Sequence, residues 1–356
     1  MANKADGMNY APESIENRVC GPGEFVFAAV GLDHGHIFGM CQAMIAAGGE
    51  LKSVYDPDPA KVQAFCEQFP HVKVARSEAE VLEDSAVGMV AAASVPSDRC
   101  ALGCRVMEHG KDYFVDKAPM TTLEQLDQAR ATASKTDRRY FVYYGERLHN
   151  EAAVYASQLV RDGAIGTVLQ VLCLAPHRLN APSRPDWFFE FEKYGGILCD
   201  IGSHQIEQIL YYTGAKDAQI LSSRVANFNS PQYPELEDFG EMSLMMDSGA
   251  SGYARVDWFT PDGLPTWGDG RTVLLGTDGT IEMRKMLDLA RSEEGNHIFL
   301  ADQKEVRHIN ATGKAGFPFF GQMILDCLNG TETAMTQAHI FKAAELTLKA
   351  QAAAIR

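Results

Sequence analysis

Short apolar runs alternate with helical stretches throughout residues 25–145, and this alternation constrains the fold more than any other feature of the sequence. The predicted strands are Phe25–Gly31, Leu51–Asp56, Val87–Ser94, Asp112–Lys117 and Tyr140–Gly145. The helical stretches between them are His36–Ala47, Ala60–Phe69, Asp98–His109 and Leu123–Thr136. Strands that alternate with helices at this spacing form a parallel sheet with helices on both faces. We therefore predict an α/β, doubly wound parallel sheet.

The predicted strands are apolar on both sides, as expected for a parallel sheet that helices cover on both faces. Two of the predicted helix starts carry a capping signal, Ser77-x-x-Glu80 and Thr121-x-x-Glu124. In such a box the hydroxyl and the acid satisfy backbone amides that the first turn leaves unpaired. We expect both helices to begin there.

After residue 146 the pattern becomes mostly β. The predicted elements are a helix at Glu151–Arg161, a strand at Val168–Leu174, a loop at 176–194, a helix at Ile201–Tyr212, strands at Gln219–Phe228, Gly240–Met246, Ala250–Phe259, Thr272–Leu275, Thr280–Arg284, His297–Leu300 and Glu305–Ile309, and helices at Pro318–Leu328 and Gln337–Ala354. Ser248-Gly249 and Asp278-Gly279 are tight-turn pairs and predict antiparallel pairing. This half is thus expected to be an α+β domain with one large, mostly antiparallel open sheet.

A length of 356 residues favours about two domains at roughly 150 residues each. We expect residues 1–23, which are polar and show no periodicity, to form an N-terminal arm. Residues 24–145 would form a dinucleotide-binding domain. Residues 146–356 would form a substrate-binding and oligomerisation domain, whose last helix, 337–354, could pack back on the first domain.

Charge and cysteine usage narrow the class of protein. Lys plus Arg number 32 against 47 for Asp plus Glu, so the net charge is −15. Such a surface repels phosphate backbones and anionic lipids, so we expect neither a nucleic-acid nor a membrane partner. The eight cysteines are scattered, and we see no apolar leader. We expect a reduced, cytoplasmic protein.

The first strand ends in the turn Gly31-Leu-Asp-His-Gly35-His36, where a dinucleotide fold presents helix amides to a pyrophosphate. The spacing departs from GxGxxG, with Asp33 and His36 in the second and third glycine places. Asp56 ends the next strand, where a carboxylate can bind ribose hydroxyls and repel a 2′-phosphate, which favours NAD over NADP. The expected cofactor contacts are Gly31, Asp33, His34, Gly35, His36, Ile37, Asp56, Ser94, Pro96, Asp116 and Lys117.

Two further observations concern this edge of the sheet. We interpret His34 and His36 as residues that shape the turn rather than as metal ligands, because the sequence supplies no obvious further ligands, and we name no metal site. The fifth strand runs into Asp116-Lys117-Ala118-Pro119. Since ligands of doubly wound sheets bind at the carboxyl ends of the strands, Lys117 is expected to face the cofactor crevice.

A second constellation is Gly195-Gly196-x-x-x-Asp200-x-Gly202-x-His204. Asp200 and His204 are spaced i and i+4, so they share one face near the start of a helix. One interpretation is a local pair in which the aspartate caps the helix. The other is proton transfer, because a histidine beside a carboxylate suits that task near pH 7.

Together these segments resemble the Gfo/Idh/MocA oxidoreductases, from about Phe25 to the C-terminus. The resemblance rests on the glycine turn, on Asp116-Lys117-Ala118-Pro119 in place of the family's Glu-Lys-Pro, on the Asp200/His204 helix start and on the hairpin at 276–279. It implies a Rossmann domain followed by a domain whose open sheet mediates dimers or tetramers. It also implies Lys117 close to the nicotinamide, His204 as proton acceptor and Asp200 as its partner.

The loop 176–194 precedes the Asp200/His204 helix and could cover the site. Its mixture of polar groups and an indole suits a polyhydroxylated ligand, although a proline-stiffened surface loop is the alternative. The expected substrate contacts are Lys117, Arg147, His177, Arg184, Trp187, Asp200 and His204. Other polar residues expected around the pocket are Glu146, His149, Arg178, Asn180 and Asp186.

The leading hypothesis is an NAD-dependent dehydrogenase that acts on a secondary alcohol of a sugar, inositol or related polyol, with Lys117, Asp200 and His204 as catalytic residues. One alternative is an enzyme that holds NAD tightly and uses transient oxidation for elimination, epimerisation or glycoside cleavage. Another is a non-catalytic NAD-binding sensor. A metal-dependent sugar isomerase built on Asp200 and His204 lacks a convincing ligand set. We expect a homodimer or homotetramer formed through the C-terminal sheet.

Overall fold

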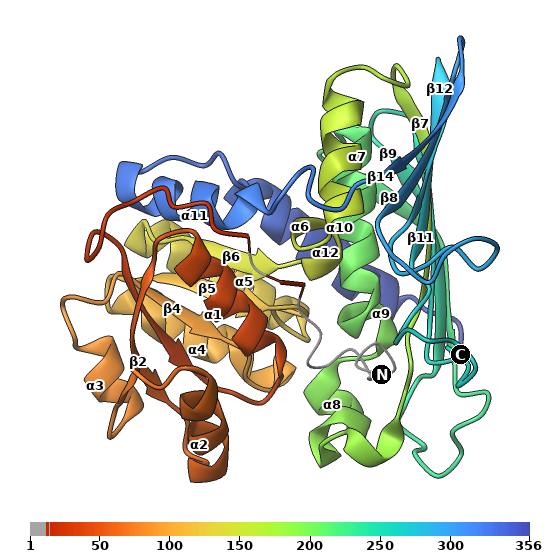
Figure 1. Cartoon of the computed structure of the whole chain (residues 1–356). Helices are drawn as coiled ribbons and strands as arrows, with labels where there is room; N and C mark the ends of the chain where they lie inside the picture. Colours follow the sequence, from red (N-terminus) through yellow and green to blue (C-terminus); the bar gives the residue numbers. More distant parts are fainter. Residues whose placement is uncertain (1–11, 14) are drawn as a thin grey trace. The chain divides into compact units, whose positions relative to one another are not determined.

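The computed structural model describes residues 12, 13 and 15–356, which form two compact units (Figure 1). The N-terminal unit holds the described residues up to Tyr143 together with Phe317–Phe341. The C-terminal unit holds Tyr144–Gly316 and Lys342–Arg356. Each unit is built around its own sheet.

This division differs from the sequence-based domains, which kept 146–356 together, because Phe317–Phe341 groups with the N-terminal unit. The rings of Phe319 and Phe320 lie 6.1 and 6.3 Å from that of Phe114, which is wholly buried in the N-terminal sheet. Aromatic contacts of this kind explain why a late helix joins the early domain.

Only part of the predicted arm, 1–23, can be traced, because residues 1–11 and 14 lie outside the described residues. The amides of Asn17 and Val19 donate to the carbonyls of Ala46 and Ala47 at 3.0 and 2.9 Å. This part of the arm therefore lies along the end of the first helix.

Six parallel strands form the N-terminal sheet in the order β3-β2-β1-β4-β5-β6. They are β1 (Val26–Val30), β2 (Glu50–Tyr55), β3 (Lys73–Val74), β4 (Met89–Ala92), β5 (Asp112–Asp116) and β6 (Tyr140–Tyr143). The helices of this unit are α1 (His36–Ala46), α2 (Pro59–Gln68), α3 (Glu78–Leu82), α4 (Pro96–Glu108), α5 (Leu123–Thr136) and α11 (Pro318–Asn329). The predicted doubly wound sheet is confirmed, and only the two-residue, exposed β3 was missed. The strand order reverses between β1 and β4, the place where such sheets bind ligands.

The helix predicted at Leu123–Thr136 is confirmed as α5, but its capping residue lies one position later than predicted. Thr122, not Thr121, caps α5: its hydroxyl accepts from the amide of Gln125 at 3.2 Å. The side chain of Gln125, not that of Glu124, returns the bond by accepting from the Thr121 amide at 2.8 Å. The prediction at α3 holds, since the Ser77 hydroxyl accepts from the Glu80 amide at 3.1 Å. Thr121-x-x-Glu124 and Thr122-x-x-Gln125 both fit the box pattern, and the structure uses the second.

Eight strands form the C-terminal sheet in the order β14-β13-β12-β11-β7-β10-β9-β8. They are β7 (Val168–Pro176), β8 (Ala218–Ala226), β9 (Phe239–Met246), β10 (Ser251–Asp257), β11 (Arg271–Gly276), β12 (Gly279–Arg284), β13 (His297–Asp302) and β14 (Val306–Asn310). Neighbouring strands pair antiparallel except β7 and β10, which are parallel. The large, mostly antiparallel open sheet is confirmed.

Helices of the C-terminal unit cover one face of its sheet (Figure 1). They include α6 (Gly145–Leu148), α7 (Glu151–Arg161), α8 (Phe191–Tyr194), α9 (Ile197–Asp200), α10 (Gly202–Thr213) and the end of α12 (Gln337–Ala352). Along the strands, buried residues such as Cys173 and Leu274 alternate with less buried ones such as Leu172 and Val273. No described helix of this unit lies on the second face in Figure 1.

Among the residues that the structure describes, no helix is long and apolar enough to cross a membrane.

Candidate functional site

The turn after β1 requires its glycine. Gly31 has a φ of +74°, and a Cβ built there would lie 2.8 Å from the Cβ of Ser94. The amide of His34 donates to the carbonyl of Ala93 at 2.8 Å, which ties the turn to the end of β4. Helix α1 then begins at His36, next to this turn, and its first amides bond back to the turn: those of Ile37 and Phe38 donate to the carbonyls of His34 and Gly35, each at 3.2 Å.

Asp56 lies directly after β2 and beside this turn. Its Oδ2 accepts from the amide of Leu32 at 2.7 Å, and its Oδ1 accepts from the amide of Asp58 at 2.9 Å. The residue is buried. Asp33, in the turn itself, pairs with Lys61 Nζ at 2.6 Å. The predicted ribose-binding acid is thus held against the glycine turn by two backbone amides.

Asp116 is the centre of a buried cluster at the end of β5. His36 Nδ1 lies 2.9 Å from its Oδ1 and His34 Nδ1 lies 3.5 Å from its Oδ2, while Arg99 Nη2 donates to Oδ2 at 3.2 Å. Burial, followed by the neighbouring His36, lowers the pKa of His34 well below its usual value. Burial alone would raise the pKa of Asp116, but His36, Arg99 and His34 together lower it. The cluster therefore stabilises the ionised form of Asp116, with the Arg99 guanidinium bonded to its Oδ2.

The geometry of His34, His36 and Asp116 also resembles that of a metal site, because one ligand atom from each lies within 4.8 Å of the others. However, His34 Nδ1 accepts from the amide of His36 at 3.2 Å, and Asp116 already carries the Arg99 guanidinium. A cation at this point would compete with that arginine. We interpret the cluster as a hydrogen-bonded brace of the turn.

Lys117 is buried and follows Asp116 at the carboxyl end of β5. The exit from this segment is fixed by Pro119, whose carbonyl accepts from the Tyr140 hydroxyl at 2.9 Å. Pro96, another predicted cofactor contact, begins α4. The hydroxyl of Ser94 is buried and finds no hydrogen-bond partner among the described residues. All the predicted cofactor contacts therefore lie at the turn or at the carboxyl ends of β1, β2, β4 and β5.

In the C-terminal unit, Asp200 ends α9 and His204 lies in the first turn of α10. Ile201 joins the two helices in a helical conformation, so the two residues are one turn apart as predicted. The preceding Gly196 has a φ of +93°, and a side chain there would overlap the Gln351 amide. The Gln351 Oε1 in turn accepts from the amide of Leu198 at 2.9 Å, which fixes where the helical segment starts.

A buried ion pair lies close to His204. Lys285 Nζ, at the end of β12, is 3.1 Å from Glu146 Oε2 and 2.9 Å from Gln208 Oε1. The amide group of Gln208 also donates to the His204 carbonyl at 3.1 Å. Burial alone would raise the pKa of Glu146, but Lys285, His204 and His177 together lower it. An ionised carboxylate thus faces both histidines, and Lys285 was missed because nothing in its local sequence marks it.

Two of the predicted substrate contacts have structural partners. Arg147 Nε donates to both carboxylate oxygens of Glu207 at 2.8 and 2.9 Å, and its guanidinium lies 3.7 Å above the Tyr211 ring. Arg184 donates to the carbonyls of Leu179 and Arg178 at 2.8 and 3.0 Å. Both arginines are buried and organise the chain around them. Their contact with substrate stays a prediction.

His177 and Trp187 occupy different parts of the loop 176–194. His177 Nε2 lies 3.9 Å from Glu146 Oε1, so this predicted contact belongs to the polar group near His204. Trp187 lies in a short 3₁₀ helix and is partly exposed, with its ring 6.0 Å from Phe188. An indole in this position remains available for a ligand.

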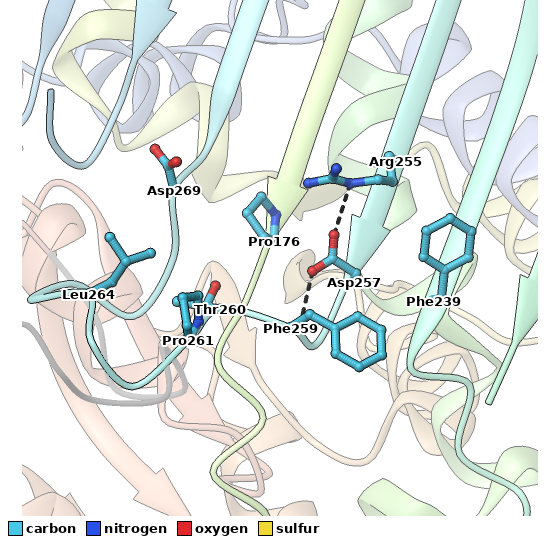
Figure 2. A pocket seen from close by; sticks show the side chains of 9 residues that line it. All are labelled: Pro176, Phe239, Arg255, Asp257, Phe259, Thr260, Pro261, Leu264 and Asp269. Carbon is cyan, nitrogen blue, oxygen red and sulfur yellow. Dashed lines mark hydrogen bonds and ion pairs between the residues drawn. The ribbon is translucent and has the colours of Figure 1, made fainter. Parts of the chain in front are cut away.

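A hollow of about 400 Å³ opens elsewhere in the C-terminal unit (Figure 2). It is lined by Pro176, Phe239, Arg255, Asp257, Phe259, Thr260, Pro261, Leu264 and Asp269. Arg255 Nε lies 2.9 Å from Asp257 Oδ2, and Figure 2 shows the two phenylalanines on one side of this pair and Leu264 on the other. Burial raises the pKa of Asp257. None of the predicted site residues lines this hollow.

Comparison with known proteins identifies the family. Residues 25–144 match the model of the oxidoreductase family with an NAD-binding Rossmann fold, and residues 154–282 match the GFO/IDH/MocA C-terminal domain. A solved structure of a putative oxidoreductase from Erwinia carotovora atroseptica SCRI1043 is 46% identical, with a TM-score of 0.90 over 93% of this chain and 99% of that one. The chain belongs to the Gfo/Idh/MocA family of oxidoreductases. The predicted family, NAD-binding domain and enzyme class are confirmed.

Two proteins of lower sequence identity to this chain have named activities. The scyllo-inositol 2-dehydrogenase (NAD(+)) of Bacillus subtilis (strain 168) is 25% identical over 241 residues, which is 66% of each chain. A levoglucosan dehydrogenase solved with NADH and levoglucosan is 15% identical, with a TM-score of 0.74 over 92% of this chain and 96% of that one. The similarity to the levoglucosan dehydrogenase supports the fold only.

The residues of the N-terminal unit fit a dinucleotide. Gly31 leaves a cradle that a Cβ would fill, and the buried Ser94 hydroxyl beside it lacks a partner among the described residues. The N-terminus of α1 lies at the same turn, and the positive end of its helix dipole favours a pyrophosphate nearby. The space at Gly31, the Ser94 hydroxyl and the start of α1 therefore fit the ribose and phosphate groups of NAD.

We predict that the Arg147–Glu207 pair is a stability element. Glu207→Gln should lower the free energy of unfolding by about 3 kcal/mol, because it leaves the buried Arg147 without its counter-charge. The measurement is denaturant unfolding at pH 7. The control is Glu78→Gln, which removes an exposed partner of Arg105 and should cost less than about 1 kcal/mol. Equal losses in the two variants would contradict the interpretation.

Proposed function

We propose that this Gfo/Idh/MocA protein is an NAD-dependent dehydrogenase that transfers a hydride between a secondary alcohol of a sugar, inositol or related polyol and nicotinamide. The observation that carries the proposal is His204, one turn from Asp200 and close to the ionised Glu146. Such surroundings favour a histidine that takes up a proton. The polyol class is supported by the relatives named for scyllo-inositol and levoglucosan.

NAD, when bound, would supply the hydride acceptor. The chain's residues then handle the proton and the charge. The substrate hydroxyl loses its proton to the imidazole of His204, in the first turn of α10. Asp200 would orient the imidazole, and Glu146 would stabilise its protonated form. Lys117 Nζ would stabilise the developing alkoxide by its positive charge.

Substitution of the two reacting side chains tests the proposal. Lys117→Met and His204→Asn should each lower kcat by about 100-fold or more, because each removes a group that acts on the charge or the proton of the transition state. The dissociation constant for NAD, measured by fluorescence titration, should stay within about threefold.

The controls are Lys73→Met and His71→Asn, which change exposed residues of the same unit and should leave kcat unchanged. Wild-type turnover in either Lys117→Met or His204→Asn would contradict the assigned roles.

Asp56 is proposed to select NAD over NADP. Asp56→Ala should weaken NAD binding and bring the NAD/NADP affinity ratio at least about tenfold closer to one, because a carboxylate that repels the 2′-phosphate is lost. The measurement is titration with both dinucleotides. Asp58→Ala is the control: it removes the cap of α2 without removing the Asp56 carboxylate. An unchanged ratio in Asp56→Ala would contradict the proposal.

We also propose that two copies of the chain associate through the uncovered face of the C-terminal sheet. Val273, Leu275 and Met245 are each more than one-third exposed there, and the hollow lined by Phe239 and Phe259 lies at one end of the same strands. Soluble sheets place polar residues on a solvated face, so an apolar one fits a second copy.

The state of association in solution tests this face. The wild type is expected to be a dimer or tetramer by light scattering, and Val273→Glu combined with Leu275→Glu should yield monomers because it places charges in a dry interface. The control is Val306→Glu on the terminal strand β14, where the side chain is 80% exposed. A wild type that is monomeric at micromolar concentration would contradict this proposal.

A further inference from the structure

Arg99 of α4 is wholly buried, and its guanidinium converges on one short segment of backbone. Nη1 donates to the carbonyls of Asp116 at 3.2 Å and Ala118 at 3.0 Å, and to that of Lys117 between them. Nη2 donates to Asp116 Oδ2, and Nε donates to the Ser94 carbonyl at 2.7 Å. One side chain thus binds three consecutive carbonyls and the end of β4.

Packing does not require an arginine at this position. Its neighbours on α4, such as Cys100, Leu102 and Val106, are buried and apolar. A buried cation costs stability unless a counter-charge and hydrogen bonds compensate it, and an apolar residue would avoid that cost. We therefore look for the function of the guanidinium in the backbone segment 116–118 that it binds.

The clamped segment contains Lys117. Its own carbonyl and those on either side of it are bound to Arg99, and the next carbonyl, that of Pro119, is bound to Tyr140. Asp116 is also bonded to His36 at the start of α1. The backbone that carries Lys117 is thus fixed from both sides and tied to the dinucleotide turn.

We propose that Arg99 is a positioning residue that holds the 116–118 backbone so that Lys117 Nζ stays at the reacting oxygen. This inference rests on the proposed role of Lys117. Arg99 affects the reaction only by fixing the backbone that carries Lys117. This role requires the planar guanidinium, which holds several donors in a fixed arrangement. A lysine at position 99 keeps the charge but cannot span the same set of carbonyls.

The test is a kinetic double-mutant cycle between Arg99→Lys and Lys117→Met. In the wild-type background Arg99→Lys should lower kcat by about 100-fold, the effect expected for a displacement near 1 Å, while NAD affinity stays within about threefold. The same substitution in the Lys117→Met background should change the residual kcat by less than about threefold, because the group that it positions is absent. If the losses of kcat in the two single variants multiply in the double variant, Arg99→Lys acts through a general structural effect and the proposal is overturned. Full turnover in Arg99→Lys would also overturn it.

Arg105→Lys, at an exposed position of the same helix, is the matched control and should leave kcat unchanged. If Lys117→Met alone turned over normally, the proposed function would fail instead of the clamp.

Discussion

The buried carboxylate of Asp116 organises the edge of the N-terminal sheet at which its strands end. It accepts from Arg99 of α4 and bonds to His36 of α1, so one charge joins the ends of β1, β4 and β5. An ionised group with no exposed surface needs such partners, because an unpaired buried charge is too costly to persist. The glycine turn and Lys117 take their places from this network.

Buried charges organise the C-terminal unit in a similar way. Arg147 and Glu207 join α6 to α10, and Lys285 and Glu146 join the end of β12 to the same region. The second pair keeps a carboxylate ionised close to His204, whereas the first serves the packing of α10. In each unit, therefore, the proposed reacting residue lies close to a buried carboxylate, and that carboxylate is paired with a basic residue of the same unit.

The sequence predicted the two sheets because strand periodicity, glycine turns and hairpin pairs are local signals, as at Gly31 and at Ser248-Gly249. Asp200 and His204 were found for the same reason, since their spacing is local. Lys285 was missed because its partner Glu146 is 139 residues away. Arg99 was missed because the partner of a long side chain is decided by tertiary packing.

The most direct test of the account is a nicotinamide-absorbance assay of the wild-type protein with NAD, and separately with NADP, against inositols, aldoses, their phosphates and glycosides. The account predicts net reduction of NAD, with little or no reduction of NADP, by one stereochemical class of polyol. NAD that binds but is not reduced by any member of the panel would contradict a net dehydrogenase and favour transient oxidation or a sensor.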